Sequence, residues 1–154
     1  MRTVFVGGPF KALIDSDTGV IPERSRARFL TIIEFFEGKG WAVLSGHREE
    51  EWGATVATSD VCTGRDWRWM HQCDLFVAFP GDPVSPGTHV ELGWASALGR
   101  PVIVVTDPGQ RVADLVLGLG EVTDVQYLEW CEPTVLKDLA KLVDAAPVVE
   151  RGSS

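Results

Sequence analysis

The sequence predicts an α/β protein in which a parallel sheet lies between two layers of helices. Short runs rich in β-branched and aromatic residues alternate with segments of helical periodicity, which is typical of strands joined by crossover helices. The runs Leu75–Phe79 and Val102–Val105 are almost continuously apolar, as expected for strands that helices cover on both faces. A length of 154 residues favours one domain, which we assign to residues 1–149.

The individual elements follow from local patterns. The expected strands are Thr3–Gly7, Trp41–Ser45, Asp74–Phe79, Pro101–Thr106 and Val125–Leu128. The most regular helix pattern begins at Pro22 and Glu23, repeats apolar residues at positions 29, 32, 33 and 36, and ends near Gly38. The other expected helices are Gly64–Gln72, Thr88–Leu98, Arg111–Leu117 and Pro133–Ala145. Residues 150–154 are expected to form a disordered tail.

The order of the strands decides where a ligand binds. In an open parallel sheet, ligands bind beyond the carboxyl ends of the strands, where neighbouring connections leave toward opposite faces. If the strand order is 2-1-3-4-5, the connections at residues 7–11 and 80–91 flank this point. We therefore look for functional residues in these two connections.

Composition excludes several classes of function. Fourteen basic and 22 acidic residues give a net charge of −8, which argues against generic binding to nucleic acids or anionic membranes. No apolar run approaches the length of a membrane span, and residues 1–9 lack a signal-peptide pattern, so we expect a cytoplasmic protein. The three cysteines and the histidines lack the spacing of a disulfide framework or metal site. The glycine-containing segments fit neither dinucleotide-binding nor Walker fingerprints, which excludes hydride and phosphoryl transfer.

Small residues precede a carboxylate at the start of one expected helix. Ser85, Gly87 and Thr88 leave backbone N–H groups accessible at a helix N-terminus, which favours phosphate binding. Glu91 shares a helix face with apolar residues, where an ionised carboxylate is costly unless it is paired or has a function. The alternative interpretation is that Glu91 is a capping residue that serves the helix dipole.

Asp66 occupies a similar place near the start of the preceding expected helix. Two carboxylates about 5 Å apart suit a retaining glycosyl transfer, in which one attacks the anomeric carbon and the other handles the proton of the leaving group. The alternative is that Asp66 pairs with Arg65 or Arg68 on a solvated helix surface.

Residues in the first two connections are candidates to contact a ligand. Phe10 follows Gly8 and Pro9 in a connection rather than a strand, so it is the best candidate to stack on a nucleobase. His47 and Arg48 follow the second strand and are candidates to contact a base or a phosphate.

Four ordered segments resemble the nucleoside 2-deoxyribosyltransferase superfamily. They are Val4–Phe10, His47–Ala54, Asp74–Gly81 and Ser85–Ala95. Within the superfamily, the sequence is most similar to the nucleoside 5′-monophosphate N-glycosidases, especially the cytidylate hydrolases of peptidyl-nucleoside antibiotic pathways. The resemblance implies a flavodoxin-like fold, no metal or organic cofactor, and a homodimer whose second subunit completes the active site. It also implies hydrolysis of CMP, or a 5-substituted CMP, to the free base and ribose 5-phosphate.

The resemblance also implies roles for individual residues. Glu91 matches the nucleophile that attacks C1′ and forms a ribosyl ester, and Asp66 matches the acid that positions or protonates the leaving base. The implied phosphate contacts are Ser85, Gly87, Thr88 and, in a second subunit, Thr123. The residues implied to face the base and sugar are Phe5, Gly8, Phe10, Lys11, His47 and Trp52. The helix N-terminus is expected to hold the phosphate and to keep Glu91 ionised.

Two of these positions bear on substrate choice. Phe5 stands where deoxyribose-specific relatives carry a tyrosine, which suggests that a ribose 2′-hydroxyl is accepted. Lys11 stands where the mildiomycin-type enzymes carry an arginine, and a lysine does not reproduce a planar bidentate fork. The resemblance therefore leaves the base and its ring substituent open.

Other functions stay open at this point. A transferase would let a second base intercept the ester, and a hydrolase could act on purine nucleotides or deoxynucleotides instead. A cytokinin-activating phosphoribohydrolase also has a loop ending in Gly-Thr-x-x-Glu, but the arginine-bearing glycine-rich signature expected there is missing. A non-catalytic nucleotide-sensing module is a further alternative, and the two carboxylates argue against it.

Overall fold

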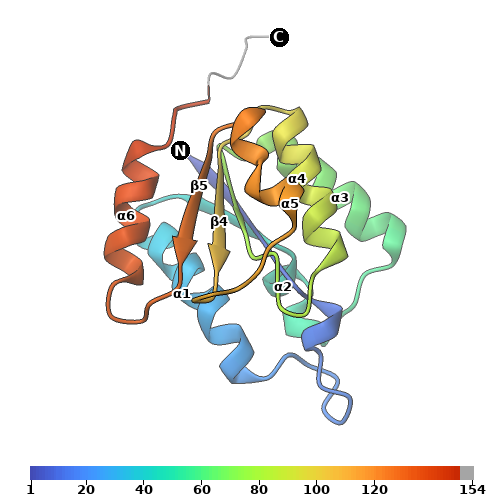
Figure 1. The fold of residues 1–154 in the computed structure, drawn as a ribbon. Coiled ribbons are helices and arrows are strands. Elements are labelled where there is room, and N and C mark those ends of the chain that lie inside the picture. Colours follow the sequence, from blue (N-terminus) through green and yellow to red (C-terminus); the bar gives the residue numbers. More distant parts are fainter. Residues whose placement is uncertain (150–154) are drawn as a thin grey trace.

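A computed structural model describes residues 1–149, in which a parallel sheet lies between two layers of helices (Figure 1). The strands are β1 (Thr3–Gly7), β2 (Ala42–Ser45), β3 (Leu75–Ala78), β4 (Val102–Thr106) and β5 (Val125–Glu129). Their order is β2-β1-β3-β4-β5, and every neighbouring pair is parallel. The predicted flavodoxin-like fold is therefore confirmed. The expected tail at residues 150–154 lies outside the described residues.

The two largest differences between the helices and the sequence prediction are an earlier start of one helix and one additional short helix. Within the described residues the α-helices are α1 (Glu23–Gly38), α2 (Gly46–Glu49), α3 (Ser59–Gln72), α4 (Pro86–Ala97), α5 (Asp114–Leu117) and α6 (Val135–Ala145). Helix α3 begins at Ser59 rather than Gly64, because Gly64 is tolerated in the helix interior and Asp60 complements the dipole in the first turn. Helix α2 was not predicted, since four residues are too few to show helical periodicity.

Two separate groups of helices cover the two faces of the sheet. Helices α1 and α6 lie on one face, and α3, α4 and α5 lie on the other (Figure 1). Side chains of β1 alternate between the two cores, so Val4 and Val6 pack under α1 while Phe5 packs under α3 and α4. Gly7 follows Phe5 by two residues and therefore lies on the α3/α4 side, where it adds no side chain.

The carboxyl ends of β1 and β3 are neighbours at one edge of the sheet. The register pairs Gly7 with Ala78, which brings the ends of the two strands level. The chain leaves β1 toward α1 on one face and leaves β3 toward α4 on the other, so this edge is the switch point where ligands bind in such folds. None of the helices in the described part of the chain has the length and apolar character needed to cross a bilayer.

Candidate active site

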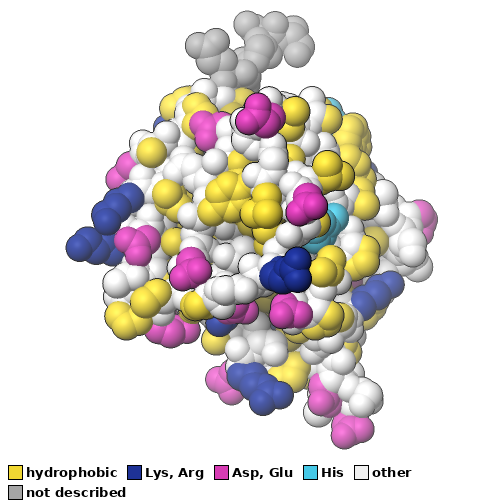
Figure 2. All heavy atoms as spheres, viewed as in Figure 1, with side chains coloured by type: hydrophobic (Ala, Val, Ile, Leu, Met, Phe, Trp, Pro, Cys, Tyr) yellow, Lys and Arg dark blue, Asp and Glu magenta, His cyan; other side chains and the backbone are white. Residues whose placement is uncertain are grey.

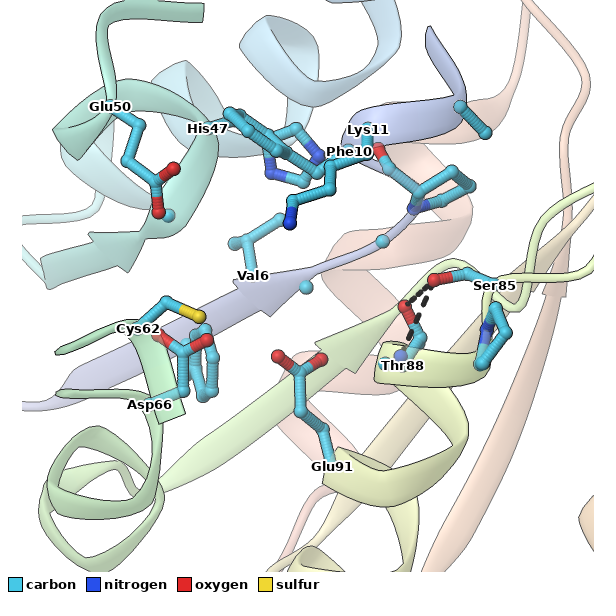
Figure 3. Close-up of a pocket in the computed structure, with 18 of the residues that line it drawn as sticks. Val6, Phe10, Lys11, His47, Glu50, Cys62, Asp66, Ser85, Thr88 and Glu91 are labelled. Atoms are coloured by element: carbon cyan, nitrogen blue, oxygen red, sulfur yellow. Dashed lines mark hydrogen bonds between the residues drawn. The ribbon is translucent and has the colours of Figure 1, made fainter. Parts of the chain in front are cut away.

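A cavity of about 410 Å³ opens at this edge of the sheet, a size typical of small-molecule sites. Its walls come from the connection after β1, from α2, from α3 and from the start of α4 (Figure 3). The sequence-predicted residues that line it are Phe5, Gly8, Phe10, Lys11, His47, Asp66, Ser85, Gly87, Thr88 and Glu91. Sequence reasoning did not assign Glu50, Cys62 or Arg65 to the site, although all three also line it.

The carboxylate of Glu91 points into the middle of the cavity (Figure 3). Its Oε2 atom is buried and accepts no hydrogen bond from the described residues. A Cβ atom at position 7 would lie only 2.5 Å from this oxygen, so the carboxylate occupies space that exists because Gly7 has no side chain. Burial, with a smaller contribution from the charge of Asp66, raises the pKa of Glu91 from 4.5 to about 8.

The structure shows that two interpretations of Glu91 made from the sequence are wrong. Glu91 is not the cap of its helix, because the Ser85 side chain caps α4 by accepting a hydrogen bond from the Thr88 N–H. The expectation that the helix N-terminus keeps Glu91 ionised is also wrong. Glu91 is the sixth residue of α4, beyond the first turn where the dipole acts most strongly, and the cost of burying the charge is larger.

Asp66 projects from α3 into the cavity near Cys62 (Figure 3). Its Oδ1 atom accepts a hydrogen bond from Arg65 Nε at 2.9 Å, and Arg65 Nη1 forms an ion pair with Glu50 Oε1 at 2.8 Å. The pairing with Arg65 was predicted for a solvated surface, but the Asp66 side chain is only 17% exposed and lines the cavity. Burial raises the pKa of Asp66, and the hydrogen bond from Arg65 opposes this rise.

The start of α4 forms the opposite end of the cavity. Ser85 Oγ accepts hydrogen bonds from the Thr88 N–H at 3.3 Å and from the Thr88 hydroxyl at 2.9 Å. The predicted row of accessible N–H groups is thus interrupted at Thr88 by the side chain of Ser85. A Cβ at Gly87 would meet nothing within 4 Å, so this backbone faces open space at the positive end of the helix dipole.

His47 supports the cavity wall that the loop after β1 forms. Its ring stacks on Phe29 with a centroid distance of 4.1 Å, and Nε2 lies 2.7 Å from the Pro9 carbonyl oxygen. A carbonyl only accepts hydrogen bonds, so Nε2 carries the proton and donates it. Burial lowers the pKa of His47 to about 4, which leaves the imidazole neutral. His47 therefore holds the Pro9–Phe10 loop in place and offers no positive charge to a phosphate.

Three predicted residues do not line the cavity. Arg48 forms an exposed ion pair with Glu37. Trp52 is partly buried against the hydrophobic core, and its ring contacts that of His47. Thr123 precedes β5, at the opposite edge of the sheet, where its hydroxyl donates to the Arg100 carbonyl oxygen. Its predicted role in a second subunit stays a prediction. Among residues 1–149, no group of three or more His, Cys, Asp or Glu is placed to hold a metal ion.

Comparison with known proteins places this geometry in a family. Residues 22–143 match the nucleoside 2-deoxyribosyltransferase family. The chain belongs to this family. The structure of the CMP N-glycosidase BcmB of Clostridium botulinum is 34% identical, with a TM-score of 0.69, and the match covers 91% of this chain and 99% of BcmB. The solution structure of BlsM is 38% identical, with a TM-score of 0.78, and the match covers 99% and 98% of the two chains.

A more distant member has the same fold. The 2-deoxyribosyltransferase of Bacillus psychrosaccharolyticus is 18% identical, with a TM-score of 0.66 and coverage of 96% of this chain and 97% of that enzyme. The comparison with curated proteins gives no match. The superfamily predicted from the four sequence segments is therefore confirmed, and so is the predicted similarity to a nucleotide N-glycosidase.

The buried carboxyl of Glu91 predicts how stability depends on pH. The folded protein holds the Glu91 proton up to about pH 8, whereas the unfolded chain releases it near 4.5, so the wild type loses stability between these values. Glu91→Gln keeps the size of the side chain and removes this titration. We expect the variant to gain up to about 4 kcal/mol relative to wild type between pH 5 and pH 9. Urea unfolding at both pH values measures this, and a stability difference that is independent of pH contradicts the buried carboxyl.

Proposed function

We propose that this protein hydrolyses the N-glycosidic bond of a pyrimidine ribonucleoside 5′-monophosphate, CMP or a 5-substituted CMP. The products are the free base and ribose 5-phosphate. The observation that carries the proposal is that the carboxylates of Glu91 and Asp66 face one cavity from different helices (Figure 3). The 34% identity to a CMP N-glycosidase supports the choice of a nucleotide substrate.

The order of groups along the cavity matches the order of groups in a nucleotide. Ser85 and Thr88 lie at one end, Asp66 and Cys62 lie at the other, and Glu91 lies between them (Figure 3). A 5′-phosphate at the start of α4 places the sugar above Glu91 and the base near Asp66, with Phe10 on the opposite wall available to stack on the base. Lys11 extends into the same space and can approach the base or the sugar.

In the first step, the bond between C1′ and the base nitrogen breaks and its electron pair leaves with the base. A Glu91 carboxylate oxygen forms a bond to C1′, which gives a ribosyl ester. The departing base needs one proton, and the Glu91 carboxyl holds one near neutral pH. Asp66 relays this proton from Glu91 to the base, so the same transfer ionises the nucleophile and neutralises the leaving group.

In the second step, water attacks C1′ and breaks the ester bond. Asp66 accepts the proton of the attacking water, and the electron pair of the broken bond returns to Glu91. Ribose 5-phosphate leaves, and the two carboxyls again hold one proton between them. The cycle therefore uses only the two carboxyls and water, in keeping with the retaining mechanism.

The proposal is tested with a panel of ribonucleoside and deoxyribonucleoside monophosphates, with chromatography of the released base. We expect CMP to release cytosine, and Glu91→Gln to lower turnover by at least about a thousandfold because the nucleophile is lost. Glu34→Gln, an exposed change on α1, is the control and keeps full activity. More than a few per cent of activity in Glu91→Gln contradicts the nucleophile. An exchanged nucleotide formed from an added foreign base identifies a transferase.

The phosphate end predicts a selective effect of Ser85→Ala. Loss of a hydrogen bond to a charged phosphate raises KM for nucleoside monophosphates by about tenfold, with little change in KM for the parent nucleosides. Ser96→Ala is the matched control, because Ser96 lies on the same helix and its hydroxyl donates to the Gly93 carbonyl oxygen. Steady-state kinetics measure both ratios. An equal rise of KM for nucleotides and nucleosides removes the phosphate role.

We also propose that the protein forms a homodimer. Leu115 and Leu117 of α5 are 88% and 59% exposed, and Val122, next to Thr123, is 68% exposed. Figure 2 shows hydrophobic side chains gathered on the face that carries α5. Exposed apolar surface of this kind marks sites of association.

The dimer predicts a particle of twice the 16.8 kDa chain mass in light scattering coupled to gel filtration. Changing both leucines of α5 to glutamate places charge in the contact and is expected to give monomers. Val148→Glu is the control, because Val148 is exposed far from α5 in the sequence, and it leaves the mass unchanged. A monomeric wild type contradicts the dimer.

A further inference from the structure

Arg65 is the charged centre of a buried cluster beside the two carboxyls. Its side chain is 13% exposed, and it binds Asp66 through Nε and Glu50 through Nη1. Glu50 comes from the residue after α2, fifteen positions before Arg65, and its side chain is 8% exposed. The cluster therefore joins two separate segments of the cavity wall.

Arg65 is held on several sides. Glu50 Oε1 accepts from its Nη1, and Glu50 Oε2 is itself fixed by the Ala57 N–H at 3.1 Å. The guanidinium lies 4.7 Å from the centre of the Trp69 ring. A Cβ at Gly46 would lie 2.9 Å from Nη2, so the glycine leaves the space that the guanidinium needs. These contacts fix the direction in which Nε donates.

We propose that Arg65, anchored by Glu50, is a positioning residue that fixes Asp66 for proton transfer to the leaving base. Nε holds Oδ1 of Asp66 at 2.9 Å, which leaves Oδ2 available for the base. A carboxyl that relays a proton between Glu91 and the base must keep one oxygen within reach of both groups, and small displacements are costly. This inference rests on the proposed function, because it assigns a task to Arg65 within that reaction.

The shape of arginine suits this task. A guanidinium presents donors in a rigid fork, so one side chain binds two carboxylates in fixed directions. A lysine places one ammonium point charge and cannot hold both partners with the same geometry. Arg65 is also the cation that pairs with the buried carboxyls of Glu50 and Asp66, and removing it leaves these acids without compensation.

Charge gives a readout that distinguishes positioning from a purely structural role. The titratable and charged groups around Asp66 are Arg65, Glu50, Glu91, His47, Cys62 and Lys11. Of these, Arg65 lowers the pKa of Asp66 through its hydrogen bond and its charge. Without Arg65, Asp66 binds its proton at higher pH. The acid limb of the kcat/KM profile is then expected to move to higher pH.

The test compares Arg65→Met, Arg65→Lys and Glu50→Gln with the control Arg68→Met, an exposed change on the same helix. With CMP as substrate, we expect Arg65→Met to lower kcat by about ten- to a hundredfold, with a smaller change in KM and an acid limb moved to higher pH. Arg65→Lys retains the charge and is intermediate. Arg68→Met keeps wild-type kinetics. Thermal unfolding of each variant identifies any loss of folding.

Coupling between Arg65 and Glu50 sharpens the test. Because Glu50 acts through Arg65, the single variant Glu50→Gln has a lower kcat than the wild type. The double variant, which carries Glu50→Gln and Arg65→Met, has the same kcat as Arg65→Met alone. Added guanidinium at millimolar concentration restores part of the activity of Arg65→Ala and none of Glu91→Gln. Wild-type kcat in Arg65→Met, or independent losses from the two changes, overturns the proposal. If Arg65→Met fails to fold, Glu50→Gln and Arg65→Lys carry the same comparison.

A measurement without turnover separates this inference from the proposed function. Carbon-13 NMR of the Asp66 carboxyl reports its titration directly, and we expect its midpoint to rise in Arg65→Met and to stay unchanged in Arg68→Met. A wild type that releases no base from any nucleotide overturns the proposed function, while the NMR titration still decides whether Arg65 controls Asp66. An unchanged midpoint in Arg65→Met overturns the inference even when the wild type is active.

Discussion

The close approach of the Glu91 carboxylate to Gly7 is the contact on which the site depends. Strand β1 ends in a residue without a side chain on the α3/α4 face, so a carboxylate from the second turn of α4 reaches the floor of the cavity. Its buried oxygen has no hydrogen-bond partner in the described chain, which makes the anion costly and the carboxyl basic. A group that is poorly stabilised as an anion gains most when positive charge develops on a sugar above it. The buried, unpaired environment of Glu91 therefore makes its carboxylate reactive toward a positively charged sugar carbon.

Local charge, rather than net charge, explains how an acidic protein can bind an anionic nucleotide. The chain carries a net charge of −8, and three of its carboxyls lie at or near the cavity. One guanidinium offsets two of them, and the third holds a proton near neutral pH. The phosphate end is built from the backbone at the start of α4, whose dipole favours an anion without adding a basic side chain. One end of the cavity therefore neutralises carboxyls with a guanidinium, and the other end attracts an anion with the backbone of a helix N-terminus.

Much of the fold followed from the sequence because hydrophobic patterns and connection lengths determine it. The alternation of strands and helices, and the position of Glu91 and Asp66 at one edge, were accessible in this way, since a parallel sheet brings the carboxyl ends of its strands together. The strand order itself entered as an assumption, which agreed with the flavodoxin-like fold that the family resemblance implies. The pair of Arg65 and Glu50 was not, because it joins residues from two segments whose packing no local pattern encodes. The pKa of Glu91 also escaped prediction, since the dipole argument uses only helix position, whereas the depth of burial decides the result. Arg48 and Trp52 lie close to the site in sequence but turn away from it.

Trapping the ribosyl ester tests the central role of Glu91 most directly. A CMP analogue with fluorine at C2′ in the arabino configuration slows both steps, because the electron-withdrawing fluorine destabilises the oxocarbenium-like transition state, and the ester accumulates. Denaturing mass spectrometry of the quenched protein, followed by peptide mapping, locates the added pentose phosphate. The account predicts one such group on Glu91, formed together with one equivalent of released base. Base release with an adduct on another residue, or with no adduct under conditions where the fluorinated product is formed, contradicts it.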